Sequence, residues 1–324
     1  MIKIIVLKVT RFFYRLLSKI IYLLIPIISK ILITLKLNSR IVNQLNRLRY
    51  ESHKTDDHNN LISKLLVDNK LVVLDVGAQG GFFEANIFSK KYNGFFDPIM
   101  VEPLSNEAEK LSKKNYKVIR KGLWSTNCKK KLYVLGKRSG SSSMYKPSKD
   151  NYDLYSFKKE NFSLFDITSE KDVECTTVGD SLNKLNIKHL DFLKIDTQGA
   201  ELEILKGLDE YRPLMIKVEA QVVPMYENVP NWSELMNYLY KIHYMTCEWV
   251  EIGPHLTRSP VEMDMIFIPN YLNDLGKKLI LSREKEFTSL MLIFGHIKLL
   301  QIISKKLNFS TNLELQKIKD KFFY

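Results

Sequence analysis

Residues 191–207 read DFLKIDTQGAELEILKG, and this stretch decides the fold. An apolar segment ends at Asp196, Gln198-Gly199 makes a turn, and an amphipathic run follows. This order is typical of a buried strand that leads into a helix. A carboxylate at the end of such a strand lies where open parallel sheets bind their ligands. Asp196 is therefore the first candidate for a functional residue.

The same alternation recurs on both sides of this stretch. Apolar segments that we expect to be strands read LVVLDV (71–76), IMVE (99–102), YKVIR (116–120), LMIKVEA (214–220), YMTCEWVEI (244–252) and MDMIFIP (263–269). Amphipathic segments separate most of them, which predicts an α/β fold with a doubly wound, mostly parallel sheet. The last two segments follow one another without a helix, so we expect an antiparallel pair there, with an antiparallel strand at the edge.

Between Leu123 and Asp191 the alternation breaks. KKKLYVL (129–135) can form one more strand, but residues 136–163 are polar and aromatic without helical or strand periodicity. A loop of that length in a compact domain is usually a functional lid or a disordered insert.

Length and charge indicate one large domain with two tails. For 324 residues with 45% hydrophobic content we expect an arm at 1–50, a domain at 51–272 and a helical extension at 273–324. Residues 1–50 hold ten Lys or Arg and no acid, so of the net charge of +13 only +3 (13 minus 10) falls on the rest. This distribution argues against a nucleic-acid groove across the domain. The three cysteines lie far apart and predict neither disulfides nor a zinc site, which fits a cytoplasmic protein.

The arm has the pattern of an amphipathic helix. Lys8, Arg11, Arg15 and Lys19 recur at steps of three and four residues among apolar side chains, which suits the surface of an anionic membrane. Its longest uncharged run, residues 20–29, is shorter than the ~20 residues that a membrane span needs. We expect the arm to place the protein peripherally on the inner face of a membrane. The alternative is a helix that packs on the domain or on a second subunit.

The turn after the first strand is glycine-rich and follows an acid. The pattern is Asp75-x-Gly77-Ala78-x-x-Gly81, at an expected strand-to-helix junction. Glycines there let the backbone approach a ligand, and a helix start offers free N–H groups. Glu102 closes the next strand, where a carboxylate can accept hydrogen bonds from two ribose hydroxyls. Together these features predict a cofactor that contains adenosine.

Gln79 discriminates between two such cofactors. A dinucleotide fingerprint has its second glycine at this position, so that pyrophosphate can touch the backbone. A glutamine obstructs that approach, whereas S-adenosylmethionine has no phosphate. The turn therefore favours S-adenosylmethionine over NAD.

Seven motifs in a fixed order carry a resemblance to a known family. They read DVGAQGGFF, VEP, GLW, SGSSSM, LDFLKIDTQGAELEILKG, IKVEAQVVPMYENVP and MDMIFIP, within residues 71–270. In this order they resemble the FkbM family of S-adenosylmethionine-dependent methyltransferases. The resemblance implies the class I methyltransferase (Rossmann-like) fold, with one antiparallel strand among seven, and O-methylation of sugars or natural products. It also implies that Asp75, Gly77, Gly81 and Glu102 hold the cofactor and that the backbone at Gly122 and Leu123 borders its adenine.

Catalysis needs a base for the acceptor hydroxyl, and the strand ends supply candidates. We predict Asp196 as that base or as the group that orients the acceptor, and Glu219 as the second candidate. Alternatively, Asp196 caps the helix that follows. Less specific candidates are His255 and the serines at 141–143, and no metal motif is visible.

The expected partner is a hydroxyl acceptor on a sugar, glycan or lipid-linked molecule. Two other readings stay open: a methyltransferase-like scaffold at a membrane without activity, and an NAD-dependent enzyme.

Overall fold

The computed structural model describes residues 56–85, 87–155, 157–252 and 260–318. The chain divides into two compact units, Met1–Ser52 and His53–Tyr324, and every described residue belongs to the second. The basic arm therefore lies outside the described residues, and so does His255. No helix in the described ranges combines the length and the apolar character needed to cross a membrane.

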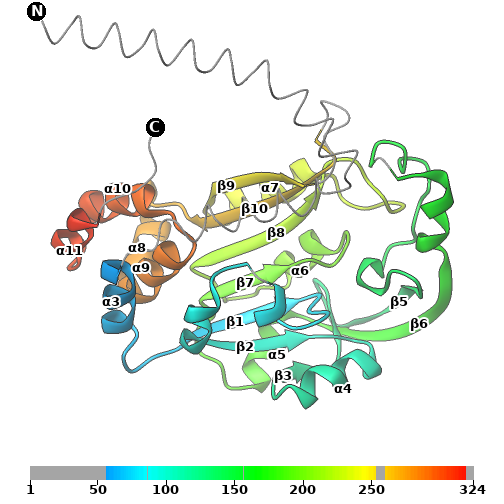
Figure 1. Ribbon diagram of the computed structural model, residues 1–324, viewed down its shortest axis with the longest axis horizontal. Coiled ribbons are helices and arrows are strands. Elements are labelled where there is room, and N and C mark those ends of the chain that lie inside the picture. Colours follow the sequence, from blue (N-terminus) through cyan, green and yellow to red (C-terminus); the bar gives the residue numbers. More distant parts are fainter. Residues whose placement is uncertain (1–55, 86, 156, 253–259, 319–324) are drawn as a thin grey trace, which may run out of the picture. The chain divides into compact units, whose positions relative to one another are not determined.

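Seven strands form the central sheet in the order β3-β2-β1-β7-β8-β10-β9 (Figure 1). Their bounds are β1 Leu71–Val76, β2 Phe96–Val101, β3 Lys117–Ile119, β7 Phe192–Ile195, β8 Met215–Gln221, β9 Tyr244–Ile252 and β10 Glu262–Pro269. Each of these strands overlaps an apolar segment that the sequence predicts as a strand, although β2 begins three residues before the predicted segment 99–102. The predicted mixed α/β fold with a mostly parallel sheet is confirmed.

The antiparallel strand lies inside the sheet. β10 runs antiparallel to both of its neighbours, β8 and β9, while the remaining described pairs of this sheet are parallel. The expected antiparallel pair, β9 and β10, does lie at one edge of the sheet, but the strand of reversed direction is β10, one place in from that edge. Helix α7 (Trp232–Lys241) carries the chain from β8 to the edge position of β9, which leaves one place open. The hairpin return then inserts β10 into that place.

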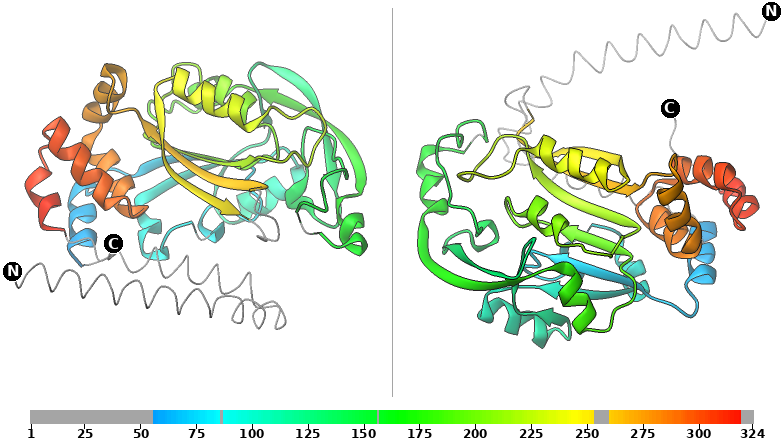
Figure 2. Two further views of the ribbon diagram at one scale, coloured as in Figure 1. Left: turned by 90° about the horizontal axis from the view of Figure 1, so that it is seen from above. Right: turned by 180° about the vertical axis from the view of Figure 1, so that it is seen from behind.

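Helices cover both faces of the sheet (Figure 2). Besides α7 they are α3 Asp56–Leu65, α4 Ser105–Lys113, α5 Val178–Lys184, α6 Glu201–Lys206, α8 Asp274–Ser282, α9 Glu284–Ile293, α10 Ile297–Leu307 and α11 Asn312–Lys317. Alternate strand residues separate two cores, because neighbouring side chains of a strand point to opposite faces. Val73 and Phe192 pack in one core with Phe287 and Leu290 of α9. The adjacent strand residues Leu74 and Leu193 pack in the other core. The C-terminal helices therefore share a core with the sheet.

The connection from β1 to β2 contains two 3₁₀ helices, η1 Phe83–Ala85 and η2 Lys90–Phe95, in its described residues. The expectation of a regular helix directly after β1 is wrong there. Gly77, Gly80 and Gly81 have φ of +81°, +89° and +110°, outside the helical region. Phe82 is fully buried directly after them, so the chain turns into the core. A ligand at this turn would meet backbone N–H groups of a loop.

A second sheet in the order β4-β6-β5 interrupts the alternation. Its strands are β4 Gly122–Leu123, β5 Cys128–Leu135 and β6 Ile167–Thr176. The sequence predicts β5, but it gives no signal for β6 or for α5. Most side chains of β6 are exposed, so the strand lacks the apolar alternation of a half-buried strand. The segment predicted as a loop contains two more 3₁₀ helices, η3 Ser139–Ser141 and η4 Lys159–Phe165. It packs around the buried rings of Tyr152 and Phe165.

Candidate functional site

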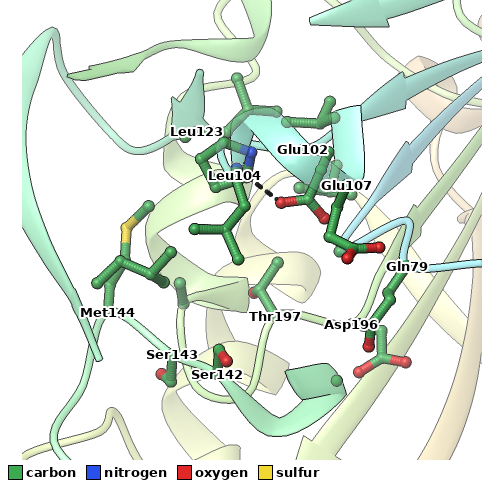
Figure 3. Close-up of a pocket in the computed structure, with 18 of the residues that line it drawn as sticks. Gln79, Glu102, Leu104, Glu107, Leu123, Ser142, Ser143, Met144, Asp196 and Thr197 are labelled. Atoms are coloured by element: carbon green, nitrogen blue, oxygen red, sulfur yellow. Dashed lines mark hydrogen bonds between the residues drawn. The ribbon is translucent and has the colours of Figure 1, made fainter. Parts of the chain in front are cut away.

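A pocket lies beyond the carboxyl ends of β1, β2 and β7, where two of the predicted strand-end acids, Glu102 and Asp196, meet (Figure 3). Its empty space is about 690 Å³, including the part open to solvent. Predicted site residues that line it are Gly77, Glu102, Gly122, Leu123 and Asp196. Asp75, Ala78, Gly81 and Glu219 are not among the lining residues.

Gly77 brings the backbones of β1 and β7 together under the pocket. It has φ +81°, and a Cβ at this position would lie 1.8 Å from the carbonyl oxygen of Asp196. The N–H of Asp196 also donates to the carbonyl of Val76 over 3.0 Å. The glycine is therefore required by both conformation and space, and it places Asp196 beside the turn.

Glu102 contributes a buried carboxylate to the pocket. Its side chain is 6% exposed, and the N–H of Leu104 donates to Oε1 over 2.8 Å. Burial raises the pKa of Glu102 to about 7, although the Leu104 N–H lowers it, and the negative charge of Glu107 raises it further. Glu107, from the first turn of α4, also lines the pocket. The sequence analysis missed Glu107, because an acid in the first turn of a helix has a sufficient explanation in the helix dipole.

One wall of the pocket is apolar. Leu104, Leu123 and Met144 lie together on this side (Figure 3). Gly122 makes the packing possible, because a Cβ there would lie 2.3 Å from the Met144 side chain and 2.8 Å from the Cys175 sulfur. This wall can accept a flat apolar ring system such as adenine.

Asp75 has a partner inside the protein. Its carboxylate is 1% exposed and accepts a hydrogen bond from the Lys194 ammonium over 2.9 Å. Burial lowers the pKa of Lys194, but the negative charges of Asp75 and Asp196 outweigh that effect and raise it above the usual value. Asp75 thus forms a buried ion pair below the pocket.

The two candidate bases share one hydrogen-bond donor. The side-chain nitrogen of Gln198 lies 3.1 Å from Oδ1 of Asp196 and 2.8 Å from Oε1 of Glu219. Burial, and then the charge of Asp196, raise the pKa of Glu219 well above its usual value. Its neighbour Glu262, on β10, has its pKa raised to about 7 by burial, against the hydrogen bond with Glu219.

The sequence predicts a helix cap as the alternative role of Asp196, but Glu201 is the acid that binds the N–H groups of the turn before α6. Both oxygens of Glu201 accept the N–H of Gly199, and Oε1 also accepts the N–H of Thr197. The residue before α6, Ala200, forms no side-chain cap. Asp196 is therefore not needed as a cap.

The serine-rich segment 139–143 lies along the pocket. Ser139, Ser142 and Ser143 line it, and the Gln79 amide donates to the Ser139 hydroxyl over 2.6 Å. Gln79 thus spans from the glycine turn to this segment. Within the described ranges no group of three or more His, Cys, Asp or Glu side chains could hold a metal ion.

Comparisons with known proteins agree with this geometry at the level of a family. The family model described as the methyltransferase FkbM domain matches residues 75–246, just over half of the chain. One similar solved structure, from E. coli, is described as a candidate DNA modification methyltransferase encoded within a prophage. Its identity is 11% and its TM-score 0.33, over 63% of this chain and 48% of the other, so this chain spans about half of that protein and the likeness carries no argument. No curated protein matches the sequence.

Proposed function

The chain belongs to the FkbM methyltransferase family, and from that premise we propose that it is an O-methyltransferase that uses S-adenosylmethionine. The proposed acceptor is a hydroxyl of a sugar, glycan or lipid-linked molecule. The proposed fold is the class I, Rossmann-like methyltransferase fold, which the strand order with its single reversed strand β10 supports.

The charge of the pocket is the observation that carries the proposal. Glu102, Glu107 and Asp196 line it, and none of the described lining residues is Lys, Arg or His. An acidic, partly buried pocket attracts cations and repels phosphates. S-adenosylmethionine bears a sulfonium and an ammonium, whereas NAD bears a pyrophosphate. The lining therefore supports the methyl donor and disfavours the NAD reading.

Residues of the pocket divide into groups that suit different parts of this donor. The Glu102 carboxylate can accept hydrogen bonds from ribose hydroxyls, and the wall formed by Leu104, Leu123 and Met144 suits the adenine ring. Gly77 has no side chain that could project into the pocket it lines, so a ligand can lie across the turn. When bound, the donor supplies a methyl group on a positively charged sulfur, which a hydroxyl oxygen can attack.

Asp196 is the proposed base, because it is the carboxylate at the end of β7 and it faces the pocket (Figure 3). A carboxylate there can accept the proton of the acceptor hydroxyl and can align its oxygen. Glu219 is a weaker candidate for this role, since it lies outside the lining and its carboxyl group also interacts with Glu262.

The proposal is tested by calorimetric titration of the full chain with S-adenosylmethionine and with NAD, and then with the Glu102→Ala variant. Saturable binding of S-adenosylmethionine alone, weakened in the variant, is the expected result. Methyl transfer from labelled donor to a panel of membrane glycans then tests the acceptor. Binding of NAD alone by a folded chain would refute the proposal, and donor binding without transfer to any glycan would favour the scaffold reading.

A further inference from the structure

Gln198 belongs to the turn of the most specific sequence motif, and the proposed reaction gives it no role so far. Its φ is +60°, a conformation that residues other than glycine rarely adopt. Its side chain does not line the pocket, yet it contacts groups on three segments of the chain, at Asp196, on β8 and at Tyr226. When a residue has an unfavourable backbone conformation and its side chain makes several hydrogen bonds, a functional role for that residue is a reasonable hypothesis.

Both hydrogens of the Gln198 amide nitrogen have an acceptor, and two groups that can donate lie beside its oxygen. Its nitrogen carries two hydrogens, one for Asp196 at 3.1 Å and one for Glu219 at 2.8 Å. Its oxygen lies 3.2 Å from the Tyr226 hydroxyl and 3.4 Å from the Gln221 amide nitrogen. The reversed amide would place an oxygen against the Asp196 carboxylate, so the contacts favour this orientation.

The same residue connects Asp196 to the serine segment of the pocket. The backbone carbonyl of Gln198 accepts the Ser143 hydroxyl over 2.7 Å, and Ser143 lines the pocket. The Tyr226 hydroxyl, beside the Gln198 oxygen, also lies 2.7 Å from the carbonyl of Ser141. The rotation of the Asp196 carboxylate and the position of this segment are thereby coupled through one side chain.

We propose that Gln198 is a positioning residue that fixes the Asp196 carboxylate toward the pocket and holds Glu219 behind it. This inference rests on the proposed function, because it explains why Asp196 and not Glu219 acts as the base of that site. With Oδ1 bound by the amide, the Asp196 carboxylate cannot rotate without breaking a hydrogen bond to a charged group. Such bonds are worth more than neutral ones, so the orientation is strongly favoured.

The test compares two ligands that differ in charge at one atom. S-adenosylhomocysteine lacks the methyl group and the positive charge on sulfur, so the ratio of its Kd to that of S-adenosylmethionine measures how well the site stabilises the sulfonium. We expect Asp196→Asn and Gln198→Met each to lower this ratio about tenfold, the equivalent of one charge-assisted hydrogen bond. Methionine keeps the length of glutamine but cannot donate.

A double-variant cycle separates positioning from a general effect on the fold. If Gln198 acts through Asp196, the variant with both substitutions has the ratio of Asp196→Asn alone. Gln316→Met is the matched control, because the Gln316 amide lies 3.4 Å from Asn312 on α11 and has no hydrogen bond to a residue of the site within the described chain, and it should keep the wild-type ratio. An unchanged ratio in Gln198→Met, or two effects that multiply, would overturn the inference.

A second variant keeps the test decisive if Gln198→Met does not fold. Tyr226→Phe removes the hydroxyl beside the Gln198 oxygen and should lower the ratio in the same direction by about threefold, the equivalent of a neutral hydrogen bond. A folded Tyr226→Phe protein with the wild-type ratio would count against Gln198. A wild-type chain that binds neither ligand would instead refute the proposed function itself.

Discussion

The carboxylate of Asp75 lies 2.9 Å from the ammonium of Lys194, and both side chains are almost fully buried below the pocket. Their residues face one another across the parallel strands β1 and β7. Removing one partner of a buried ion pair leaves the other charge unpaired in a medium of low polarity. The acid that precedes the glycine turn is therefore first of all a structural group.

Asp75→Asn should accordingly act on stability. We expect the free energy of unfolding to fall by about 3 to 5 kcal/mol, because the Lys194 charge stays buried without its partner. Urea unfolding of the free chain measures this loss. The variant Asp75→Leu with Lys194→Met, which removes both charges, should recover part of it. Asp75→Asn with wild-type stability but weaker binding of S-adenosylmethionine would show that Asp75 contacts the donor after all.

Binding of the donor should depend on pH through Glu102. Burial raises the pKa of Glu102 to about 7 from the usual 4.5, and the ionised form is the better acceptor for ribose hydroxyls. Affinity for S-adenosylmethionine should therefore rise about tenfold from pH 6 to pH 8, as the ionised fraction grows. Stability of the free chain has the opposite sign, since a folded pKa above the unfolded one makes stability fall as pH rises from 4.5 through 7.

Calorimetric titration at several pH values measures the affinity. Glu102→Gln should remove most of the pH dependence, and this difference isolates Glu102 from Glu262, whose pKa burial also raises to about 7. Equal pH dependence in the wild type and the variant would exclude Glu102 as the titrating group.

The central sheet could be predicted because its information is local. The segments that form β1 and β7 are mostly apolar and almost entirely buried, as is typical of parallel strands covered on both faces. The charged strand β6 escapes this signal: its Glu170 is paired across the sheet with Lys131 of β5, and the pairing partner lies 39 residues away. Exposed cross-strand pairs leave no apolar period in the sequence.

The site was predictable only as far as topology determines it. Strand ends in a parallel sheet meet at one edge, so Glu102 and Asp196 line a common pocket. Topology cannot show which acids already have partners. Asp75 pairs with a lysine 119 residues away, and Glu219 is bound by Gln198, contacts that depend on packed side chains.

The basic arm should bind anionic membrane surfaces. Its ten Lys or Arg without an acid, on an apolar background, suit adsorption to negatively charged lipid. We expect the full chain to sediment with vesicles that contain phosphatidylserine, and to be released by high salt because exposed charges are screened. Deletion of residues 1–40 should abolish sedimentation, and unchanged partition after the deletion would contradict this role.

Arg283 should make the C-terminal helices indispensable to the fold. At the start of α9 it pairs with the buried Asp191 and donates to the carbonyl of Leu190 over 3.0 Å. The other Asp191 oxygen accepts the N–H of Val72 over 2.7 Å, so the helix, β7 and β1 are joined at one point. Arg283→Met should lower the free energy of unfolding by about 3 kcal/mol, since it leaves Asp191 buried and unpaired.

Lys277→Met is the control for Arg283, because it removes an ion pair with Asp274 whose carboxylate is largely exposed. It should change stability by less than about 0.5 kcal/mol, as exposed pairs within one helix do. If both variants changed the free energy of unfolding by the same small amount, helices α8–α11 would not be needed for the stability of the sheet.

Gly77 and Gly80 offer a test of how close the backbones approach under the pocket. Both have positive φ, so alanine at either position should cost about 1 to 2 kcal/mol from conformation alone. At Gly80 a Cβ would meet no atom within 4 Å, whereas at Gly77 it would lie 1.8 Å from the carbonyl oxygen of Asp196. Gly77→Ala must therefore push β1 away from the end of β7.

We expect Gly80→Ala to fold and to bind S-adenosylmethionine nearly as the wild type does, and Gly77→Ala to lose donor binding and most of its stability. Melting temperatures and donor titrations of the two variants measure the difference, and a Gly77→Ala protein that matches Gly80→Ala in both would show that the turn has room for a side chain.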